Sequence, residues 1–398
     1  MSSENNIPAQ DTLLTIVEPA WGSQLASIIL ELEQLRARKL GGPLPAHVFF
    51  QIKSIFHMLE SLGSARIEGN RTTLAAFVEH VIEQRQAPRT EDEKIREVAN
   101  IEDALDFIET NVQAGTEISR ALCSEIHQIV VKELPTGSGG EGSRTPGVYR
   151  TVPVVINHAD HTPPEPVRVP ELMEELFAFV NKPVESKYDL LVTALSHHRF
   201  AWIHPFDNGN GRVVRMFTYA MLIKQGFRVG DGRLINPTAI FCADRNKYYD
   251  MLALADTGTP EVRLSWCEYV LSGLRDEIHK VDRLLDYQFM VEKILLPALS
   301  DAREHAYITE REHRILERTI HNDSMTIKSA DIEAVIGESS PVMRSRIIAG
   351  LRQKGMLVPM TENGRIYYVE FYNNYLLRSV IRVLERAGFV PPSLNNNN

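Results

Sequence analysis

The stretch that decides the fold is His204–Arg215, which reads His-Pro-Phe-Asp-Asn-Gly-Asn-Gly-Arg-Val-Val-Arg. Apolar residues at helical spacing precede it over 191–203 and follow it over 213–223. This pattern predicts two helices joined by a polar, glycine-rich turn. The first turn of the second helix carries unpaired backbone N–H groups, which suit an anion, above all phosphate. The sequence therefore predicts a phosphate site at this turn.

The side chains of the turn strengthen that prediction. Gly209 and Gly211 bracket Asn210, so the backbone amides can approach an anion without a Cβ in the way. Arg212 and Arg215 lie three residues apart, share a helix face and could both hold phosphate oxygens. An ordinary charged surface turn is the alternative for each residue alone, but their joint occurrence disfavours it.

Two further residues bring chemistry to the same turn. His204 stands at its start and can titrate near neutral pH, which suits a general base. Asp207 offers hard oxygen ligands that could hold Mg²⁺ on a nucleotide. A base, an anion site, two guanidinium groups and a carboxylate within one turn indicate chemistry on a phosphate.

Composition sets broad limits on the class of protein. A chain of 398 residues predicts two or three domains, and its net charge of −9 disfavours wholesale binding of nucleic acid or anionic membrane. It has no apolar run of the roughly eighteen residues that a membrane helix needs. The three cysteines are far apart and form no CxxC pair. They predict buried thiols in a reducing compartment, and hence a cytoplasmic protein. The missing apolar run predicts that the protein has no membrane partner.

Helical periodicity dominates the chain and predicts a mainly α fold. We expect an N-terminal helical region over 1–110, a catalytic core over 111–299, a winged helix-turn-helix domain over 300–390 and a disordered tail over 391–398. Between the helices of the core, residues 147–166 contain a β-branched run followed by three prolines within 158–166, which predict a small β-hairpin flap.

The C-terminal domain is predicted from the order of its elements. Helix patterns over 310–320, 329–336 and 342–354 precede two strands, 355–360 and 366–371, joined by an Asn-Gly turn. The third helix and its surroundings carry basic residues that could contact DNA, and acidic residues dilute them. The basic set is Arg344, Arg346, Arg352, Lys354, Lys328 and Arg365, and the acidic set is Asp331, Glu333, Glu338 and Glu362.

The turn at 204–215 closely resembles the signature of the Fic family, H-x-F-x-D/E-G-N-G-R-x-x-R. Ser64–Asn70 resembles the family's inhibitory motif, S/T-x-x-x-E-G/N, and Tyr248-Tyr249 matches a tyrosine pair found after the family core. The segment 147–156 looks like its target-docking flap. The resemblance covers about residues 40–280. It implies a mainly helical fold and transfer of AMP from ATP to a Ser, Thr or Tyr hydroxyl of a target protein, and makes a homodimer plausible.

The resemblance also implies roles for individual residues. His204 would be the base, Arg212 would hold the β-phosphate side, and Arg215 would hold the γ-phosphate. Glu68, with Ser64, would inhibit the reaction through a salt bridge to Arg215. The remaining nucleotide-binding positions would be Asn208, Gly209, Asn210, Gly211, Tyr248 and Tyr249, and the target would dock on Val152, Val154 and Ile156.

The chain departs from the family pattern at one position. Asn208 stands where the family has an acidic residue, and the carboxylate lies one place earlier, at Asp207. A neutral amide is a weaker Mg²⁺ ligand than a carboxylate. Either Asp207 substitutes through a small backbone adjustment, which we favour because the turn is glycine-rich, or metal binding is weakened and the reaction altered.

Two other classes of protein remain open. The first is a winged-helix DNA-binding regulator whose nucleotide-binding domain has weak or altered transferase activity, including removal of AMP. The second is a metal hydrolase that uses His158, His161, His197 and His198, which fits poorly because the first two lie in a proline-rich loop.

Overall fold

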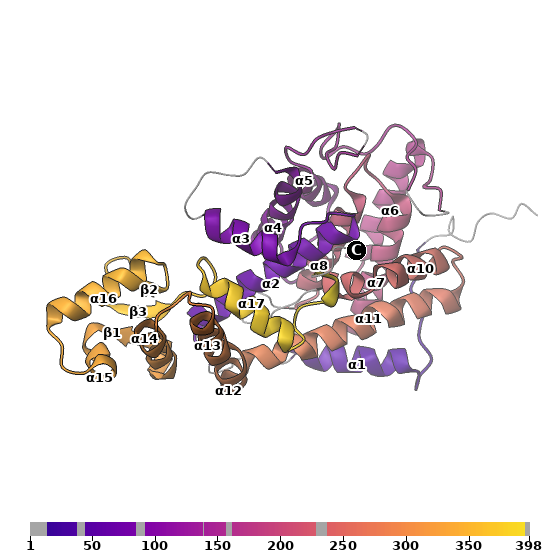
Figure 1. Ribbon diagram of the computed structural model, residues 1–398. Helices are drawn as coiled ribbons and strands as arrows, with labels where there is room; N and C mark the ends of the chain where they lie inside the picture. The colour runs from indigo at the N-terminus through magenta and orange to yellow at the C-terminus, as the bar shows by residue number, and fades with distance from the viewer. Residues whose placement is uncertain are drawn as a thin grey trace, which may run out of the picture. The chain divides into compact units, whose positions relative to one another are not determined.

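The computed structural model describes residues 14–37, 44–84, 92–137, 139–156, 161–227 and 237–394. The chain divides into two compact units. Unit 1 consists of Met1–Leu40, Glu60–Arg71 and Glu91–His279, and unit 2 consists of Gly41–Leu59, Thr72–Thr90 and Lys280–Asn398. The predicted mainly helical fold is confirmed (Figure 1).

Unit 1 is built from helices. Its described elements are α1 (Gln24–Ala37), the end of α2 (Ala46–Ile67), α4 (Glu93–Asn111), α5 (Arg120–Val130), α6 (Val169–Asn181), α7 (Asp189–Ile203), α8 (Asn210–Lys224), α9 (Thr238–Ala243), α10 (Arg245–Ala255) and most of α11 (Pro260–Asp282).

Helices α7 and α8 form the centre of unit 1 and pack against each other. Every residue of α7 from Leu190 to Phe200 is buried, and so is every residue of α8 from Arg212 to Ile223. A helix that is buried on all sides must be covered by neighbouring parts of the chain. Here α6 covers α7, while α4 and α5 cover α8. The turn predicted to carry the chemistry therefore joins the two most buried helices, which hold it rigidly.

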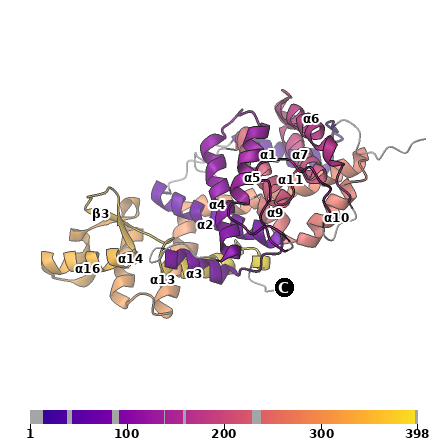
Figure 2. The same cartoon turned by 90° about the horizontal axis from the view of Figure 1, so that it is seen from above.

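Unit 2 combines helices with the sheet. Its described elements are the start of α2, α3 (Leu74–Gln84), α12 (Tyr287–Phe289), a π-helical turn (Met290–Leu295), α13 (Leu296–Glu304), α14 (Glu310–His321), β1 (Thr326–Lys328), α15 (Glu333–Ile336), α16 (Pro341–Gln353), β2 (Leu357–Pro359), β3 (Ile366–Val369) and α17 (Leu376–Arg386). The strands pair antiparallel in the order β1-β3-β2. Figure 2 shows α14 and α16 beside β3.

The helices and the two strands that we predicted for residues 310–371 are present, and β1 is an additional strand. The assignment of this region as a winged helix stays a prediction. Two of its basic residues are engaged in ion pairs. Arg344 Nη1 lies 2.7 Å from Glu333 Oε2, and Lys354 Nζ lies 2.6 Å from Glu312 Oε1. These contacts do not favour the DNA-binding alternative.

Residues 41–59 and 72–90 belong to unit 2, although the sequence suggested one N-terminal helical region. The reason lies in side-chain contacts with the C-terminal residues. Gln51 Nε2 donates to Val369 O at 3.0 Å, Phe371 N donates to Gln51 Oε1 at 2.6 Å, and Arg378 Nε donates to Glu79 Oε1 at 2.6 Å. Such long-range contacts leave no local signal in the sequence.

The β-hairpin predicted for the flap is not found in the described residues. Residues 147–156 and 161–165 contain no strand, and residues 157–160 lie outside the described part of the chain. All three cysteines are buried free thiols, as predicted. Within the described ranges, the helices are too short or too polar to cross a membrane.

Asp301 provides a test of the core of unit 2. Its side chain is 2% exposed and accepts hydrogen bonds from Arg382 Nε at 2.9 Å and Arg386 Nη2 at 3.2 Å. Asp301→Ala should lower the free energy of unfolding by about 2–3 kcal/mol, because it removes charge-assisted hydrogen bonds and leaves a partly buried guanidinium unpaired. Urea unfolding would measure the loss, and an unchanged midpoint would contradict the assignment. Asp276→Ala on the exposed surface is the control.

Candidate active site

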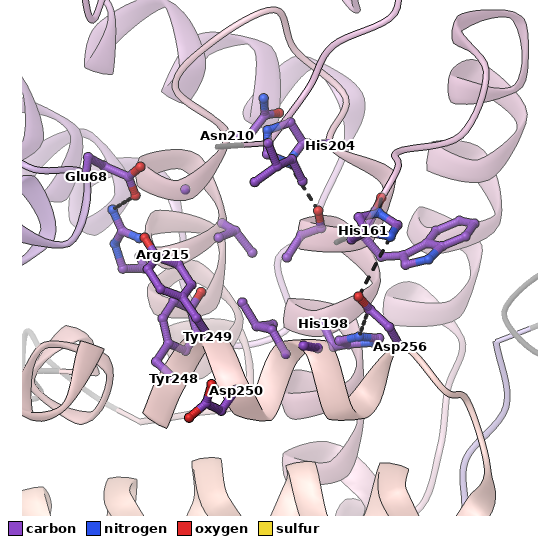
Figure 3. A pocket seen from close by; sticks show the side chains of 17 residues that line it. Glu68, His161, His198, His204, Asn210, Arg215, Tyr248, Tyr249, Asp250 and Asp256 are labelled. Atoms are coloured by element: carbon purple, nitrogen blue, oxygen red, sulfur yellow. Dashed lines mark hydrogen bonds and ion pairs between the residues drawn. The ribbon is translucent and has the colours of Figure 1, made fainter. Parts of the chain in front are cut away.

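A cavity of about 320 Å³ opens in unit 1 between the end of α2, the turn at 204–211 and α10 (Figure 3). Several predicted site residues line it. They are Ile156, Glu68, His204, Asn210, Gly211, Arg215, Tyr248 and Tyr249. Asp207, Asn208, Gly209 and Arg212 do not belong to the lining. The cavity has the size of small-molecule sites, which begin at about 300 Å³.

The turn is shaped by its own residues. His204 ends α7 in the left-handed conformation, with φ of 53°. Gly209 has φ of 75°, and a Cβ there would lie 2.9 Å from Val131 Cγ1. The Asn210 side chain closes the turn, since its Oδ1 accepts from Phe206 N and its Nδ2 donates to Phe206 O, both at 2.9 Å. Asn210 therefore holds the turn in shape with its side chain and leaves the first amides of α8 beside the cavity.

Arg215 is held by the end of α2. Its side chain is 1% exposed, so its charge needs a partner. The Nε atom donates to Ser64 Oγ at 2.8 Å, and Nη2 donates to Ser64 O at 2.9 Å and to Glu68 Oε1 at 2.7 Å. Figure 3 shows Glu68 and Arg215 facing each other across one end of the cavity.

Glu68 lies in the turn that follows α2. Burial would raise the pKa of Glu68, but the charge and hydrogen bond of Arg215 outweigh it and lower that pKa below its usual value. The carboxylate also lies in close contact with Gly211, since a Cβ at this residue would fall 2.1 Å from Glu68 Oε1. Glu68 therefore occupies, as an anion, the space next to the first amides of α8.

Arg212 points elsewhere, although the sequence suggested a second phosphate-binding arginine. Its side chain is fully buried. The Nη1 atom lies 3.3 Å from Glu97 Oε1, and Nη2 lies 3.0 Å from Glu141 Oε2 and donates to Glu141 O at 2.7 Å. Two carboxylates compensate this buried charge, so its contacts are those of a structural residue.

The carboxylate of Asp207 does not fit the predicted Mg²⁺ ligand. Its Oδ1 accepts from Ser143 Oγ and its Oδ2 accepts from Arg144 N at 2.9 Å, so both oxygens hold the 140–144 segment. Asn208 has a similar task, because its Nδ2 donates to Gly140 O at 2.9 Å. The described residues contain no cluster of His, Cys, Asp or Glu suited to a metal. We therefore derive no step through Mg²⁺.

His127 and Arg150 support the turn from outside, and no role was predicted for either of them. The His127 ring stacks on Phe206 at 3.8 Å, its Nδ1 accepts from Gly147 N at 2.7 Å, and its Nε2 lies 3.1 Å from Asn208 O. Arg150 Nε donates to His204 O at 2.8 Å. Both residues connect the flap to the turn through backbone atoms, for which the sequence offers no signal.

The other end of the cavity carries a second polar cluster. His198 Nε2 lies 2.9 Å from Asp256 Oδ1, and His161 Nδ1 lies 3.7 Å from Asp256 Oδ2 (Figure 3). The His161 Nε2 atom lies 2.9 Å from Trp202 O. His197 is separate and buried against Thr218 and Tyr248. His161 and His198 meet at Asp256, whereas His197 does not join them, and the described residues contain no group of side chains suited to a metal. This arrangement argues against the metal hydrolase, and His158 lies outside the described residues.

The two neighbouring tyrosines, Tyr248 and Tyr249, differ in burial and in hydrogen-bond partner. Tyr248 is buried, and its Oη donates to His197 Nε2 at 2.9 Å. Tyr249 is 38% exposed, and its Oη donates to Ile67 O at 3.1 Å. Of the three predicted docking residues, Val152 is exposed while Val154 and Ile156 are half-buried.

Residues 117–222, which carry this turn and its supporting helices, match the family model described as Fic/DOC. The chain contains a Fic domain. The likeness to a solved Fic family protein of Desulfovibrio desulfuricans covers 90% of this chain and 98% of that one, with a TM-score of 0.54 and 19% identity. A Fic domain protein of Bacteroides thetaiotaomicron is similar over 66% of this chain and 97% of its own, with a TM-score of 0.50 and 16% identity. Both likenesses show the fold.

Sequence relatives extend beyond the Fic domain itself. The chain is 31% identical over 201 residues to a protein adenylyltransferase Fic of Nematostella vectensis, which is 49% of this chain and 42% of that protein. A protein adenylyltransferase Fic of Drosophila virilis is 30% identical over 205 residues, or 51% of this chain and 38% of its own length. The chain thus spans less than half the length of these relatives.

Proposed function

We propose that the chain is a protein adenylyltransferase that moves AMP from ATP to a Ser, Thr or Tyr hydroxyl of a target protein and is inhibited by its own Glu68. One observation carries the proposal. His204, Arg215 and the first residues of α8 line one cavity, so a base, a cation and helix N-terminal amides face the same space. The named relatives of the Fic domain support the choice of ATP and of a protein acceptor.

Each of these groups has a distinct role in the reaction. The amides of Asn210 and Gly211, at the positive end of α8, bind the α- and β-phosphates, and Arg215 binds the γ-phosphate. The target hydroxyl oxygen bonds to the α-phosphorus, its proton passes to His204, and the bond to the β-phosphate oxygen breaks to release pyrophosphate. Donors fixed in advance around the phosphates stabilise the charge that develops in the transition state.

Inhibition follows from the contacts of Arg215. Its Nε and Nη2 atoms already donate to Ser64 and Glu68, which leaves the guanidinium engaged away from a γ-phosphate. The anionic Glu68 carboxylate beside Gly211 also repels phosphate. ATP that binds under these conditions lacks its γ-phosphate contact and is misplaced for in-line attack.

The identity of the transferred group can be tested directly. Purified Glu68→Gly protein would be incubated with ATP labelled on the α- or the γ-phosphate, beside α-labelled GTP, UTP and CTP. We expect the α-label of ATP to stay on protein and the γ-label to leave. Retention of the γ-label would indicate phosphorylation instead, and preference for another nucleotide would reject ATP as the substrate.

The pH dependence of transfer should reflect the burial of His204. Burial lowers the pKa of His204 to about 4, from an ordinary value of 6.5. The imidazole therefore stays neutral and able to accept a proton well below pH 6.5. In Glu68→Gly protein, kcat/KM should stay level from about pH 8 to about pH 5 and fall as the pH approaches 4, because kcat/KM reports the base of the free enzyme.

The fold must be monitored in the same experiment. A histidine with a lowered folded-state pKa contributes stability that is complete above pH 6.5 and is lost as the pH falls towards 4. The pKa of His127 is also lowered to about 4 by burial, so it acts in the same window. Circular dichroism at each pH gives the folded fraction. An acidic limb near pH 6.5 in fully folded protein would contradict the assignment of His204 as the base.

A further inference from the structure

Asn70, two residues after Glu68, is anchored to α4. Its side chain is 7% exposed, and its Nδ2 atom donates to Glu97 Oε2 and to Lys94 O, both at 2.8 Å. Its backbone N–H also donates to Ala65 O at 3.1 Å, which ties it back to the last turn of α2. Asn70 thus fixes the far end of the turn that carries Glu68.

Glu97 extends this anchor to the catalytic turn. It is 2% exposed, and its other oxygen, Oε1, lies 3.3 Å from Arg212 Nη1 on the first turn of α8. Burial raises the pKa of Glu97 to about 7 even though Arg212 opposes the shift. One buried side chain therefore contacts the inhibitory segment through Asn70 and the start of α8 through Arg212. Truncation of one partner in such a buried cluster has a high cost.

The turn needs such an anchor because no helix positions Glu68. Helix α2 ends at Ile67, and Gly69 follows Glu68 with φ of 102°, where the chain reverses. On the helix side, Ser64 contacts Arg215. On the other side, the side chain of Asn70 donates hydrogen bonds to Glu97 and Lys94 of α4. Without them, the Glu68 carboxylate would spend less time within reach of Arg215.

We propose that Asn70 is a positioning residue that, through Glu97 and Lys94, holds Glu68 in its inhibitory contact with Arg215. The proposal rests on the proposed inhibition by Glu68 and adds a second residue that is remote from the phosphates. It implies that inhibition depends on the attachment of the 64–70 segment to α4 as well as on the ion pair itself.

The test compares two buried asparagines of the same unit in the full chain. Asn70→Ala should raise self-modification with α-labelled ATP by about 5- to 30-fold, as expected for the loss of one or two buried hydrogen bonds. Asn100→Ala is the matched control, because Asn100 is also buried and donates from Nδ2 to Lys132 O at 2.8 Å, away from the 64–70 segment. It should lose similar stability without this gain in self-modification.

A double variant distinguishes an effect of Asn70 on the position of Glu68 from a general destabilisation of the fold. Asn70→Ala should add nothing to Glu68→Gly, since both act through the same carboxylate. Hydrogen exchange of a peptide covering 64–70 should be faster in Asn70→Ala than in Asn100→Ala. If Asn70→Ala does not fold, Asn70→Ser serves in its place.

Three results would overturn the inference. One is an Asn70→Ala protein as inactive as wild type while Glu68→Gly is active. The second is equal activation by Asn100→Ala, and the third is further activation in the double variant. If Glu68→Gly itself shows no gain, the proposed inhibition fails first, which distinguishes the two failures.

Discussion

Replacement of His204 by alanine in the Glu68→Gly background should lower AMP transfer by about 10²- to 10⁴-fold, the usual contribution of a positioned general base. A hydroxyl is a poor nucleophile near neutral pH and needs a proton acceptor as it attacks. His204 lines the cavity and stays neutral there, because burial lowers its pKa to about 4. Nucleotide binding should change little, since Arg215 and the amides of α8 remain. The measurement is kcat from α-labelled ATP, together with a nucleotide Kd from calorimetry.

His161→Ala in the same background is the matched comparison. His161 lines the same cavity, but its Nε2 atom is engaged with Trp202 O at 2.9 Å and its Nδ1 faces Asp256. We expect a loss of kcat below about tenfold, because neither nitrogen is free to accept a proton from the target. A larger loss in His161→Ala than in His204→Ala would move the base to the other end of the cavity.

Glu68→Gly alone should raise self-modification by about 10- to 100-fold. The ion pair to Arg215, at 2.7 Å, is a charge-assisted hydrogen bond on a buried guanidinium. Such bonds contribute about 1.5–3 kcal/mol, which corresponds to a change of about 10- to 100-fold in the fraction of protein whose Arg215 is released from Glu68. The released guanidinium can then bind the γ-phosphate. Glycine is tolerated because Glu68 lies in a turn after α2 and not within the helix.

Glu68→Gln is the control that separates charge from shape. The amide oxygen can still accept from Arg215, but the negative charge beside Gly211 is gone. We expect activation intermediate between wild type and Glu68→Gly. The melting temperature of each variant shows whether the fold is kept. Self-modification of Glu68→Gly at the wild-type level, in folded protein that binds ATP, would reject inhibition by this residue.

Much of the helical fold could be predicted because its signals are local. The apolar spacing on either side of 204–215 predicted α7 and α8, and the structure moves the start of α8 only to Asn210. The break after Ile67 coincides with Gly69, whose φ of 102° suits a residue without a side chain. Prediction was weaker for extended segments. The flap has β-branched residues but no strand in its described part, since strand formation needs a partner that local sequence does not supply.

Within the site, too, some residues of the 204–215 turn were predicted correctly and others were not. His204, Arg215, Asn210 and Gly211 reach the cavity as their sequence positions suggested. Arg212 and Asp207 do not line it. Glu97 and Glu141 engage Arg212, while the Ser143 hydroxyl and the Arg144 backbone N–H engage Asp207.

By itself, the sequence determined the two central helices, the glycine-rich turn between them and the types of residue available for phosphate chemistry, because periodicity and glycine act over a few neighbouring residues. The tertiary structure alone decided which charges meet. Glu68 and Arg215 are 147 residues apart, and Glu97 and Arg212 lie on different helices. A buried charge must be paired, but its partner is chosen by packing between distant segments. That choice leaves Arg215 at the cavity paired with Glu68 and directs Arg212 into the core.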